Sequence, residues 1–189
     1  MNLTLGFIGT GNMGLPIAKN LLESGYSLRV FNRTAGKAAS LAALGAEVVL
    51  SYGETAEPGE IVFTMLSDDN ALEQVAVGGN ELVKALGAGG IHVSLSTVSP
   101  AASRRVAEHH KAFGVSYLAA PVFGRPEAAA ARMLWICLSG AQAAKARVEP
   151  ILKTLGRGVT DFGEDPGGAN VAKLAGNFLL VSAVEAMGE

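Results

Sequence analysis

A run of glycines near the beginning of the chain limits its fold more than any other feature. A short apolar segment, residues 3–8, leads into Gly9-Thr10-Gly11-Asn12-Met13-Gly14, and an apolar-periodic segment follows through Leu22. This is G-x-G-x-x-G spacing between a strand and a helix. The first glycine allows a tight turn, the second lets a pyrophosphate approach, and the third lets the helix lie close to the strand. The pattern predicts a dinucleotide-binding turn, because the free N–H groups of the helix N-terminus attract phosphates.

A second predicted strand, residues 27–31, closes this unit at the expected distance. The alternative, a glycine-rich turn that binds nothing, is disfavoured by the strands on both sides. An NAD-preferring site carries an acidic residue at the end of the second strand, whereas this chain has Asn32-Arg33-Thr34, with Lys37 one turn further on. A guanidinium suits a 2′-phosphate by charge and geometry, so the sequence favours NADP over NAD. The alternative for Arg33 is a solvated loop residue.

Composition excludes several classes of protein. The 189 residues carry a net charge of −2 and no Lys/Arg cluster, which argues against a nucleic-acid partner. Cys137 is the single cysteine, so no intrachain disulfide is possible, and we expect it to be a buried small hydrophobe. Nothing approaches 18 uninterrupted apolar residues and no signal-peptide pattern opens the chain, so we predict no membrane span and a cytoplasmic location.

Alternating predicted strands and helices indicate an α/β fold with a Rossmann-type, doubly wound, mainly parallel sheet. Further strands are expected at residues 46–50, 60–66, 91–95, 115–118, 133–138 and 159–162, and helices at 35–44, 81–86, 100–113 and 141–155, from 67 onward, and from Asp165-Pro166 to Glu189. The turn after a parallel strand faces the ligand crevice, so Met65 and Leu66 are candidates to line the cofactor. We expect a dinucleotide-binding domain over residues 1–165 and the start of a connecting helix over 166–189.

Within that last helix, Lys173 and Asn177 lie four residues apart and hence on one face. The lysine stands among small, uncharged residues that leave room for a substrate. Partial burial and a nearby nicotinamide cation would lower its pKa toward general acid/base use. The alternative is an ordinary surface lysine.

Other chemistry-bearing residues point to structural roles. We expect His92 to be a packed or edge histidine within a strand, His109 and His110 to be solvated, and Trp135 to be in the core. No Cys, His or carboxylate grouping has metal-ligand spacing, so no metal is predicted.

Taken together, the motifs resemble the NADP-binding domain of the β-hydroxyacid dehydrogenases, the family of 3-hydroxyisobutyrate dehydrogenase, tartronate semialdehyde reductase and glyoxylate/succinic semialdehyde reductase. The matching motifs follow in order along the whole chain: the glycine turn with Met13 and Asn20-Leu21, Asn32-Arg33-Thr34, Met65-Leu66, Ser96-Thr97-Val98-Ser99-Pro100, Ala120-Pro121-Val122, and Lys173 with Asn177.

The resemblance implies hydride transfer between the nicotinamide and a small β-hydroxyacid or semialdehyde. Lys173 matches the catalytic lysine, Asn177 the residue that holds the substrate beside it, and Ser96 and Thr97 positions that touch substrate and nicotinamide. The residues expected to contact the cofactor are Gly9, Gly11, Asn12, Met13, Gly14, Asn32, Arg33, Thr34, Met65, Leu66 and Thr97. Those expected to contact substrate are Ser96, Phe123, Gly124 and Arg125.

The chain departs from the family pattern in two places. The substrate-carboxylate loop commonly reads Asp-Ala-Pro-Val-Ser-Gly-Gly, but here Phe123 replaces the serine and Arg125 the second glycine. Arg125 could bind an anion bidentately or point to solvent. Family members also continue into a helical domain that dimerises, so a full-length form is expected to be a homo-oligomer, and this chain stops inside the connecting helix. Two alternatives stay open: a cofactor-binding module without turnover, and a reductase of imines or other carbonyls.

Overall fold

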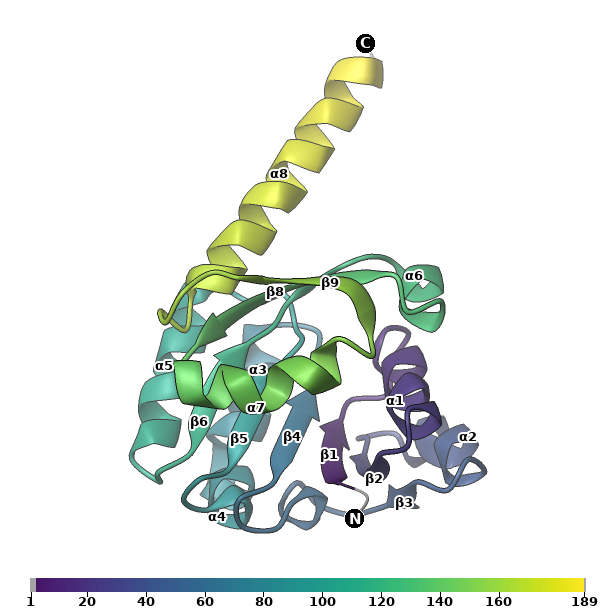
Figure 1. Ribbon diagram of the computed structural model, residues 1–189, viewed down its shortest axis with the longest axis vertical. Coiled ribbons are helices and arrows are strands. Elements are labelled where there is room, and N and C mark those ends of the chain that lie inside the picture. The colour runs from purple at the N-terminus through teal and green to yellow at the C-terminus, as the bar shows by residue number, and fades with distance from the viewer. Residues whose placement is uncertain (1–2, 189) are drawn as a thin grey trace.

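A mixed sheet covered by helices on both faces forms the body of the molecule, and one long helix projects from it (Figure 1). The computed structural model describes residues 3–188, without the side chains of Ala35 and Lys37. The expected α/β, doubly wound, mainly parallel fold that ends in a long helix is confirmed.

The strands follow the order β3-β2-β1-β4-β5-β6-β8-β7, and β9 pairs with β8. The strands from β1 to β6 are mutually parallel, β8 is antiparallel to β6 and β7, and β9 is parallel to β8. Successive strands are added to one side of β1 as far as β3, and from β4 onward to its other side. The point between β1 and β4 where the order reverses is where ligands bind in open α/β sheets. The bounds are β1 Thr4–Ile8, β2 Ser27–Phe31, β3 Glu47–Val48, β4 Ile61–Thr64, β5 Ile91–Ser94, β6 Ser116–Ala119, β7 Val122–Phe123, β8 Leu134–Gly140 and β9 Gly156–Asp161.

Helices pack on both faces of the sheet because its strands are apolar on both sides. Residues of α1 and α7 share one core cluster with the sheet, and α3, α4 and α5 contribute to the clusters on the other face. The bounds are α1 Gly14–Glu23, α2 Ala39–Ala42, α3 Asp69–Ala76, α4 Glu81–Leu86, α5 Pro100–Lys111, α6 Pro126–Ala130, α7 Gln142–Leu152 and α8 Gly168–Gly188, with 3-10 turns η1 Ala35–Ala38, η2 Gly53–Thr55 and η3 Gly78–Asn80.

Helix α5 begins as the sequence predicts. Ser99 is its N-cap, with its hydroxyl accepting a hydrogen bond from the Ala102 N–H at 3.1 Å, and Pro100 is the first helical residue. The helix expected over residues 35–44 is instead a 3-10 turn followed by four α-helical residues, and β3 is two residues long.

Trp135 is not in the core, contrary to the sequence-based expectation. Its ring is 42% exposed, its Nε1 donates to Thr160 Oγ1 at 2.8 Å, and the Arg157 guanidinium carbon lies 5.9 Å from the ring centroid. The reason is strand alternation: Leu134 and Ile136 on either side of it fill the main core, which directs Trp135 to the opposite face of β8.

His110 is buried rather than solvated, which corrects a second expectation. Its Nε2 lies 3.0 Å from His92 Nδ1, and His92 Nε2 lies 2.9 Å from Thr64 Oγ1. The two rings stack with their centroids 5.0 Å apart. His110 follows buried Val106 by four residues and therefore lies on the apolar stripe of α5.

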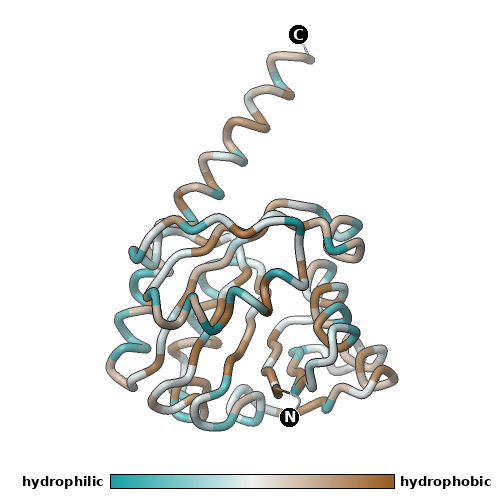
Figure 2. Tube along the Cα trace, viewed as in Figure 1, coloured by the Kyte–Doolittle hydropathy of each residue, from teal (hydrophilic) through white to brown (hydrophobic). Residues whose placement is uncertain are grey.

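Helix α8 begins at Gly168, so the expected start at Asp165-Pro166 is about two residues early. Asp165 nevertheless accepts from the Gly167 N–H at 3.0 Å and pairs with Arg104. Residue 189, the expected end of this helix, lies outside the described residues. The projecting part of the helix is coloured as hydrophobic along much of its length in Figure 2. Its exposed apolar residues beyond Asn177 are Phe178, Leu179, Leu180, Val181, Val184 and Met187.

Within residues 3–188, α8 is also the one helix long and apolar enough to cross a membrane by length and composition. The most apolar stretch of 18 residues in α8 has a mean hydropathy of 1.3, although polar residues interrupt it. A single such helix is weak evidence for a span, because helices that pack in soluble proteins pass the same test.

Candidate cofactor cleft and lysine site

Three glycines shape the turn between β1 and α1, each for a different reason. Gly9 has φ +97°, and a Cβ there would lie 2.3 Å from the Met65 carbonyl oxygen. A Cβ on Gly14 would lie 1.9 Å from the Gly9 carbonyl oxygen. A Cβ on Gly11 would meet no described heavy atom within 4 Å. Gly9 and Gly14 are therefore required by packing, whereas Gly11 faces open space.

Asn32 connects the glycine turn to the end of β2. Its Oδ1 accepts a hydrogen bond from the Thr10 N–H at 2.9 Å, and its Nδ2 donates to the Thr34 carbonyl at 2.8 Å. The side chain expected to contact the cofactor thus holds the turn in place. Thr10, which the sequence reasoning did not single out, has a buried Oγ1 without a partner among the described residues.

A cleft of about 270 Å³ opens at the carboxyl ends of β1, β2 and β4. Of the expected cofactor residues, Gly9, Gly11, Asn32, Arg33, Met65 and Leu66 line it. Asn12 lines an adjoining hollow with Thr10 and Gly36. Tyr52 and Gln74 also line the cleft, and no sequence motif marked them. The opening beside Gly11, the N-terminus of α1 and the buried Thr10 hydroxyl fit the phosphates of a dinucleotide.

The remaining expected cofactor residues surround this cleft less directly. Met13 and Gly14 form the start of α1, and Thr34 is exposed after β2. The side chain of Lys37 lies outside what the structure describes. Thr97 is exposed after β5, whereas neighbouring Ser96 is fully buried and its Oγ accepts from the Leu66 N–H at 2.8 Å. Ser96 thus fixes the turn after β4.

Lys173 is a buried lysine without a carboxylate partner. It is 8% exposed, and its Nζ lies 3.9 Å from the centroid of the Phe123 ring. Within the described part of the chain, no oxygen accepts a hydrogen bond from this ammonium. Lys145 is also buried, at 3% exposed, but its Nζ donates to both Asp161 carboxylate oxygens at 2.7 Å and to the Gly163 carbonyl at 3.3 Å.

Burial lowers the pKa of Lys173 below that of a free lysine, since desolvation disfavours the charged form, and the nearby Cys137 thiol opposes the shift in part. Cys137 is buried, as expected, and desolvation raises the pKa of its thiol. Asn177 follows Lys173 by one turn of α8 and is half-buried. Lys173 and Asn177 therefore lie together at the foot of the projecting helix.

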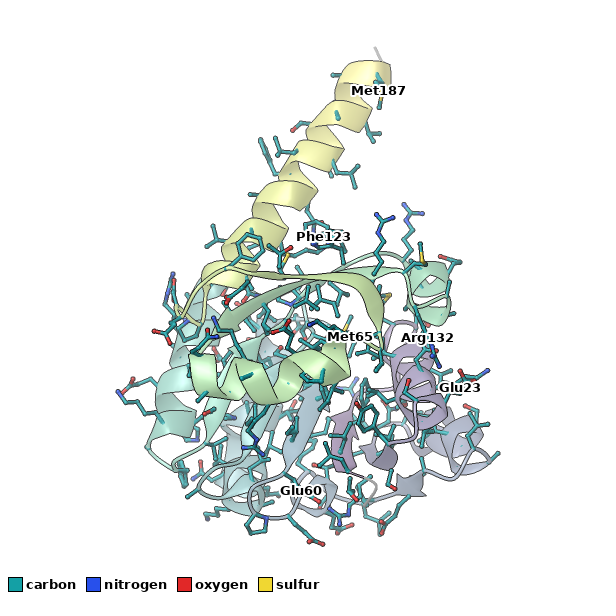
Figure 3. The ribbon with its side chains drawn as sticks, viewed as in Figure 1. Glu23, Glu60, Met65, Phe123, Arg132 and Met187 are labelled. Carbon is teal, nitrogen blue, oxygen red and sulfur yellow. The ribbon has the colours of Figure 1, made fainter. Side chains whose placement is uncertain are left out.

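The expected substrate loop begins at β7, against the foot of α8 (Figure 3). Phe123 contacts the helix, Gly124 has φ +138°, and Arg125 is exposed. A Cβ on Gly124 would lie 2.7 Å from Leu134 Cδ2, so the loop backbone is tightly packed.

The α6 segment that follows this loop docks on α1. Asn20 Nδ2, on the buried side of α1, donates to the Ala129 carbonyl at 2.7 Å. Arg132 Nη2 lies 3.2 Å from Glu23 Oε2. Figure 3 labels both side chains, which lie near each other. The helix that begins at the glycine turn therefore also supports the segment that follows the expected substrate loop. Across residues 3–188, no group of three or more His, Cys, Asp or Glu side chains could hold a metal ion.

Residues 4–163 match the family model described as the NAD binding domain of 6-phosphogluconate dehydrogenase. Among curated proteins, the chain is 43% identical over 187 residues to the uncharacterized oxidoreductase YfjR of Bacillus subtilis, covering 99% of this chain and 65% of that protein. The chain thus spans slightly less than two thirds of this relative.

Solved structures of related proteins superpose on almost the whole of this chain. A 3-hydroxyisobutyrate dehydrogenase of Mycobacterium tuberculosis with L-serine superposes with a TM-score of 0.90 at 28% identity, covering 98% of this chain and 64% of that one. An imine reductase variant from Myxococcus stipitatus in complex with NAD⁺ gives 0.91 at 26% identity, covering 99% and 64%. The resemblance to the NAD(P)-binding domain of 3-hydroxyisobutyrate dehydrogenase-like proteins is thereby confirmed.

Proposed function

This chain belongs to the family of the NAD binding domain of 6-phosphogluconate dehydrogenase, and we propose that it forms the cofactor-binding part of an NADP-dependent oxidoreductase. Residues 1–165 are assigned to this domain and residues 166–189 to the start of a connecting helix. The reaction is hydride transfer between the nicotinamide and a small hydroxyl or carbonyl substrate. The observation that carries the proposal is Lys173, a residue that is only 8% exposed and whose ammonium has no oxygen partner among the described residues.

The cleft residues suit the pyrophosphate and the adenosine ribose of the cofactor, which supplies or accepts the hydride when it is bound. The N–H groups around Gly11 and the N-terminus of α1 bind the pyrophosphate. Exposed Arg33, at the end of β2, pairs with a 2′-phosphate and favours NADP over NAD. Asn32 does not compete for the ligand, because its amide is used by Thr10 and Thr34.

Lys173 acts as the general acid in reduction and as the general base in oxidation. Its Nζ gives a proton to the carbonyl oxygen of the substrate, or takes one from the hydroxyl. Burial lowers the lysine pKa and so raises the fraction of neutral amine that is available for the oxidation direction. Asn177, on the same face one turn later, donates a hydrogen bond to the same oxygen and orients it.

Two substrate classes follow from the relatives. One is a β-hydroxyacid or semialdehyde, in line with the 3-hydroxyisobutyrate dehydrogenase. The other is a neutral carbonyl or imine, in line with the imine reductase, and the Phe123 ring against Lys173 favours it. A cofactor-binding module without turnover is the third possibility, and it would bind NADPH without consuming it.

Cofactor titration tests the proposal. The natural protein is titrated with NADPH and NADH by fluorescence, alongside Arg33→Ala and the matched control Arg157→Ala, which alters an arginine on β9. We expect tighter binding of NADPH than of NADH, a loss of that preference in Arg33→Ala, and no change in Arg157→Ala. Folded protein that binds neither nucleotide would refute the proposal, and equal affinity for both would refute its NADP preference.

A further inference from the structure

The aromatic ring of Phe123 forms one wall of the space around the Lys173 ammonium. The Nζ lies over the ring face, 3.9 Å from its centroid, which is well within the range of a cation–π contact. Phe123, Cys137 and Ala169 belong to one apolar cluster, so the surroundings of the lysine on this side are hydrocarbon and sulfur. We call Phe123, Cys137, Lys173 and Gly176 the lysine cluster.

Gly176 makes room for this ring. A Cβ at position 176 would lie 2.5 Å from Phe123 Cζ and 2.9 Å from Cε1, so no larger residue fits while the ring stays in place. A glycine in a helix interior is less favourable than alanine, so the space left for the ring has a cost in helix stability. The position of the ring is also fixed from the other side, because Phe123 pairs with Trp135 in the β7–β8 ladder and Gly124 packs against Leu134.

This wall offers nothing that could bind a carboxylate. A carboxylate removed from water needs hydrogen-bond donors in compensation, and an aromatic ring provides none. Among the polar donors at the foot of α8, the proposed reaction uses Lys173 Nζ and the Asn177 amide at the reacting oxygen. Asn170 Nδ2 also lacks a partner among the described residues, but Asn170 is only 1% exposed. Arg125 is exposed.

We propose that Phe123 is a specificity-determining residue, and that its ring, packed on Gly176 beneath Lys173, selects carbonyl substrates whose chain ends in a neutral hydrocarbon group. Semialdehydes with a carboxylate at that position are disfavoured. This inference rests on the proposed oxidoreductase function and decides between its two substrate classes.

A matched pair of aldehydes tests the selection. Pentanal and succinic semialdehyde share the aldehyde and the next two carbons, and they differ in ending with an ethyl group or a carboxylate. We expect the natural protein with NADPH to show kcat/KM at least tenfold higher for pentanal. A preference for succinic semialdehyde would overturn the inference without any variant, and its loss in Arg125→Ala would then assign the carboxylate site to Arg125.

Two substitutions at the ring separate selection from folding. Phe123→Ser removes the wall and adds a hydroxyl, so the ratio of kcat/KM values should shift toward succinic semialdehyde by about tenfold or more. Phe123→Leu keeps a hydrocarbon wall and should keep the preference for pentanal. A residue that serves only the fold would lower both rates together and leave the ratio unchanged, and that result would overturn the inference.

Cofactor affinity and one control variant complete the test. The NADPH dissociation constant should be the same in Phe123→Ser and the natural protein, because the ring lies outside the cofactor cleft. Phe162→Ser removes an aromatic ring that is 40% exposed and outside the lysine cluster, and it should leave the ratio unchanged. Protein that binds NADPH but reduces neither aldehyde nor any imine refutes the proposed function, and the inference falls with it. Reduction with an unaltered ratio in Phe123→Ser refutes the inference alone.

Discussion

At the scale of single residues, the hydrogen-bond partners of two buried lysines distinguish a structural residue from a candidate catalytic one. Lys145 has three protein oxygens within hydrogen-bond distance, and Lys173 lies over an aromatic ring. A buried cation with its partners satisfied stabilises the fold, whereas one with free donors is costly unless a ligand uses them.

Substituting each lysine by methionine should separate the two roles. Lys173→Met should lower kcat of the natural protein by about 10²–10⁴-fold, the range of a lost general acid, while NADPH affinity and melting temperature stay close to normal. Lys145→Met should keep its activity per folded molecule but lose about 1–3 kcal/mol of stability with its charged hydrogen bonds. Steady-state kinetics and thermal melts measure both, and a fully active Lys173→Met would contradict the assignment.

The buried histidine pair predicts a loss of stability in acid. Desolvation, with a smaller contribution from His109, lowers the pKa of His110 from its ordinary 6.5 to about 4, and burial lowers that of His92 well below 6.5. Below pH 6.5, these two histidines therefore bind more protons in the unfolded chain than in the folded one. Stability is complete above pH 6.5 and falls as the pH drops toward 4, by about 1.4 kcal/mol per pH unit for each such group.

The variant His110→Gln removes one of these groups and should flatten the decline. Urea unfolding of the natural chain and the variant at several pH values between 6.5 and 4 measures the slope. A variant slope as steep as that of the natural chain would show that His110 does not carry the effect.

The sequence indicated which residues could take part in chemistry more readily than it indicated the surroundings of each residue. The glycine turn and Lys173 could be picked out because few other residues serve there. Trp135 and His110 were misjudged because their burial depends on which face of a strand or helix meets the core. For His110 the signal was present, since it follows Val106 by one helical turn. Nothing in the sequence places Phe123 beside Gly176, because the two lie 53 positions apart.

At the scale of elements, the β1–α1 unit combines packing and ligand requirements in one turn. Gly14 allows α1 to touch the turn itself, and Gly11 leaves the outer side open. Element positions with a strong local cause, such as Ser99 and Pro100 at the start of α5, were predictable. The antiparallel pairing of β7 and β8 was not, since it depends on contacts between distant segments.

Alanine at each of two glycines should give opposite results. Gly14→Ala would bring its Cβ to 1.9 Å from a carbonyl oxygen and should destabilise the fold by about 1–3 kcal/mol or more. Gly11→Ala meets nothing in the described residues, so stability should stay within about 0.5 kcal/mol while NADPH affinity falls. Thermal melts and nucleotide titration distinguish these outcomes, and undiminished binding by Gly11→Ala would argue against a pyrophosphate at this turn.

At the scale of the whole molecule, α8 belongs to the body at one end and leaves it at the other. Its buried residues, Ala169, Asn170 and Lys173, all lie in the first two turns. Asn170 Oδ1 accepts from Ser103, and the Ala169 N–H donates to Ser139 Oγ. The sequence predicted the helix from its continuous pattern. Its dependence on the body could not be predicted, because these hydrogen bonds come from α5 and β8.

Shortened chains test where the domain ends. A chain that stops at Asn177 keeps these contacts and should melt at the temperature of residues 1–189. A chain that stops at Asp165 loses the buried hydrogen bonds of Asn170 and Ala169 and should be less stable by about 2–4 kcal/mol. Equal melting temperatures for both chains would instead place the boundary at residues 165/166, where the sequence predicts it.

The attachment of α8 to the body through its first two turns has a mechanical consequence. Lys173 lies five residues from the start of the helix and Gly188 lies twenty, about 7.5 Å and 30 Å along the axis. If the helix pivots about its first turn, any sideways displacement of its outer end reaches the lysine reduced about fourfold. Forces applied to the outer end, by whatever contacts its exposed apolar side chains, would thus move the proposed acid/base group about a quarter as far as the outer end, and a shift of about 1 Å at such a group is enough to change the rate.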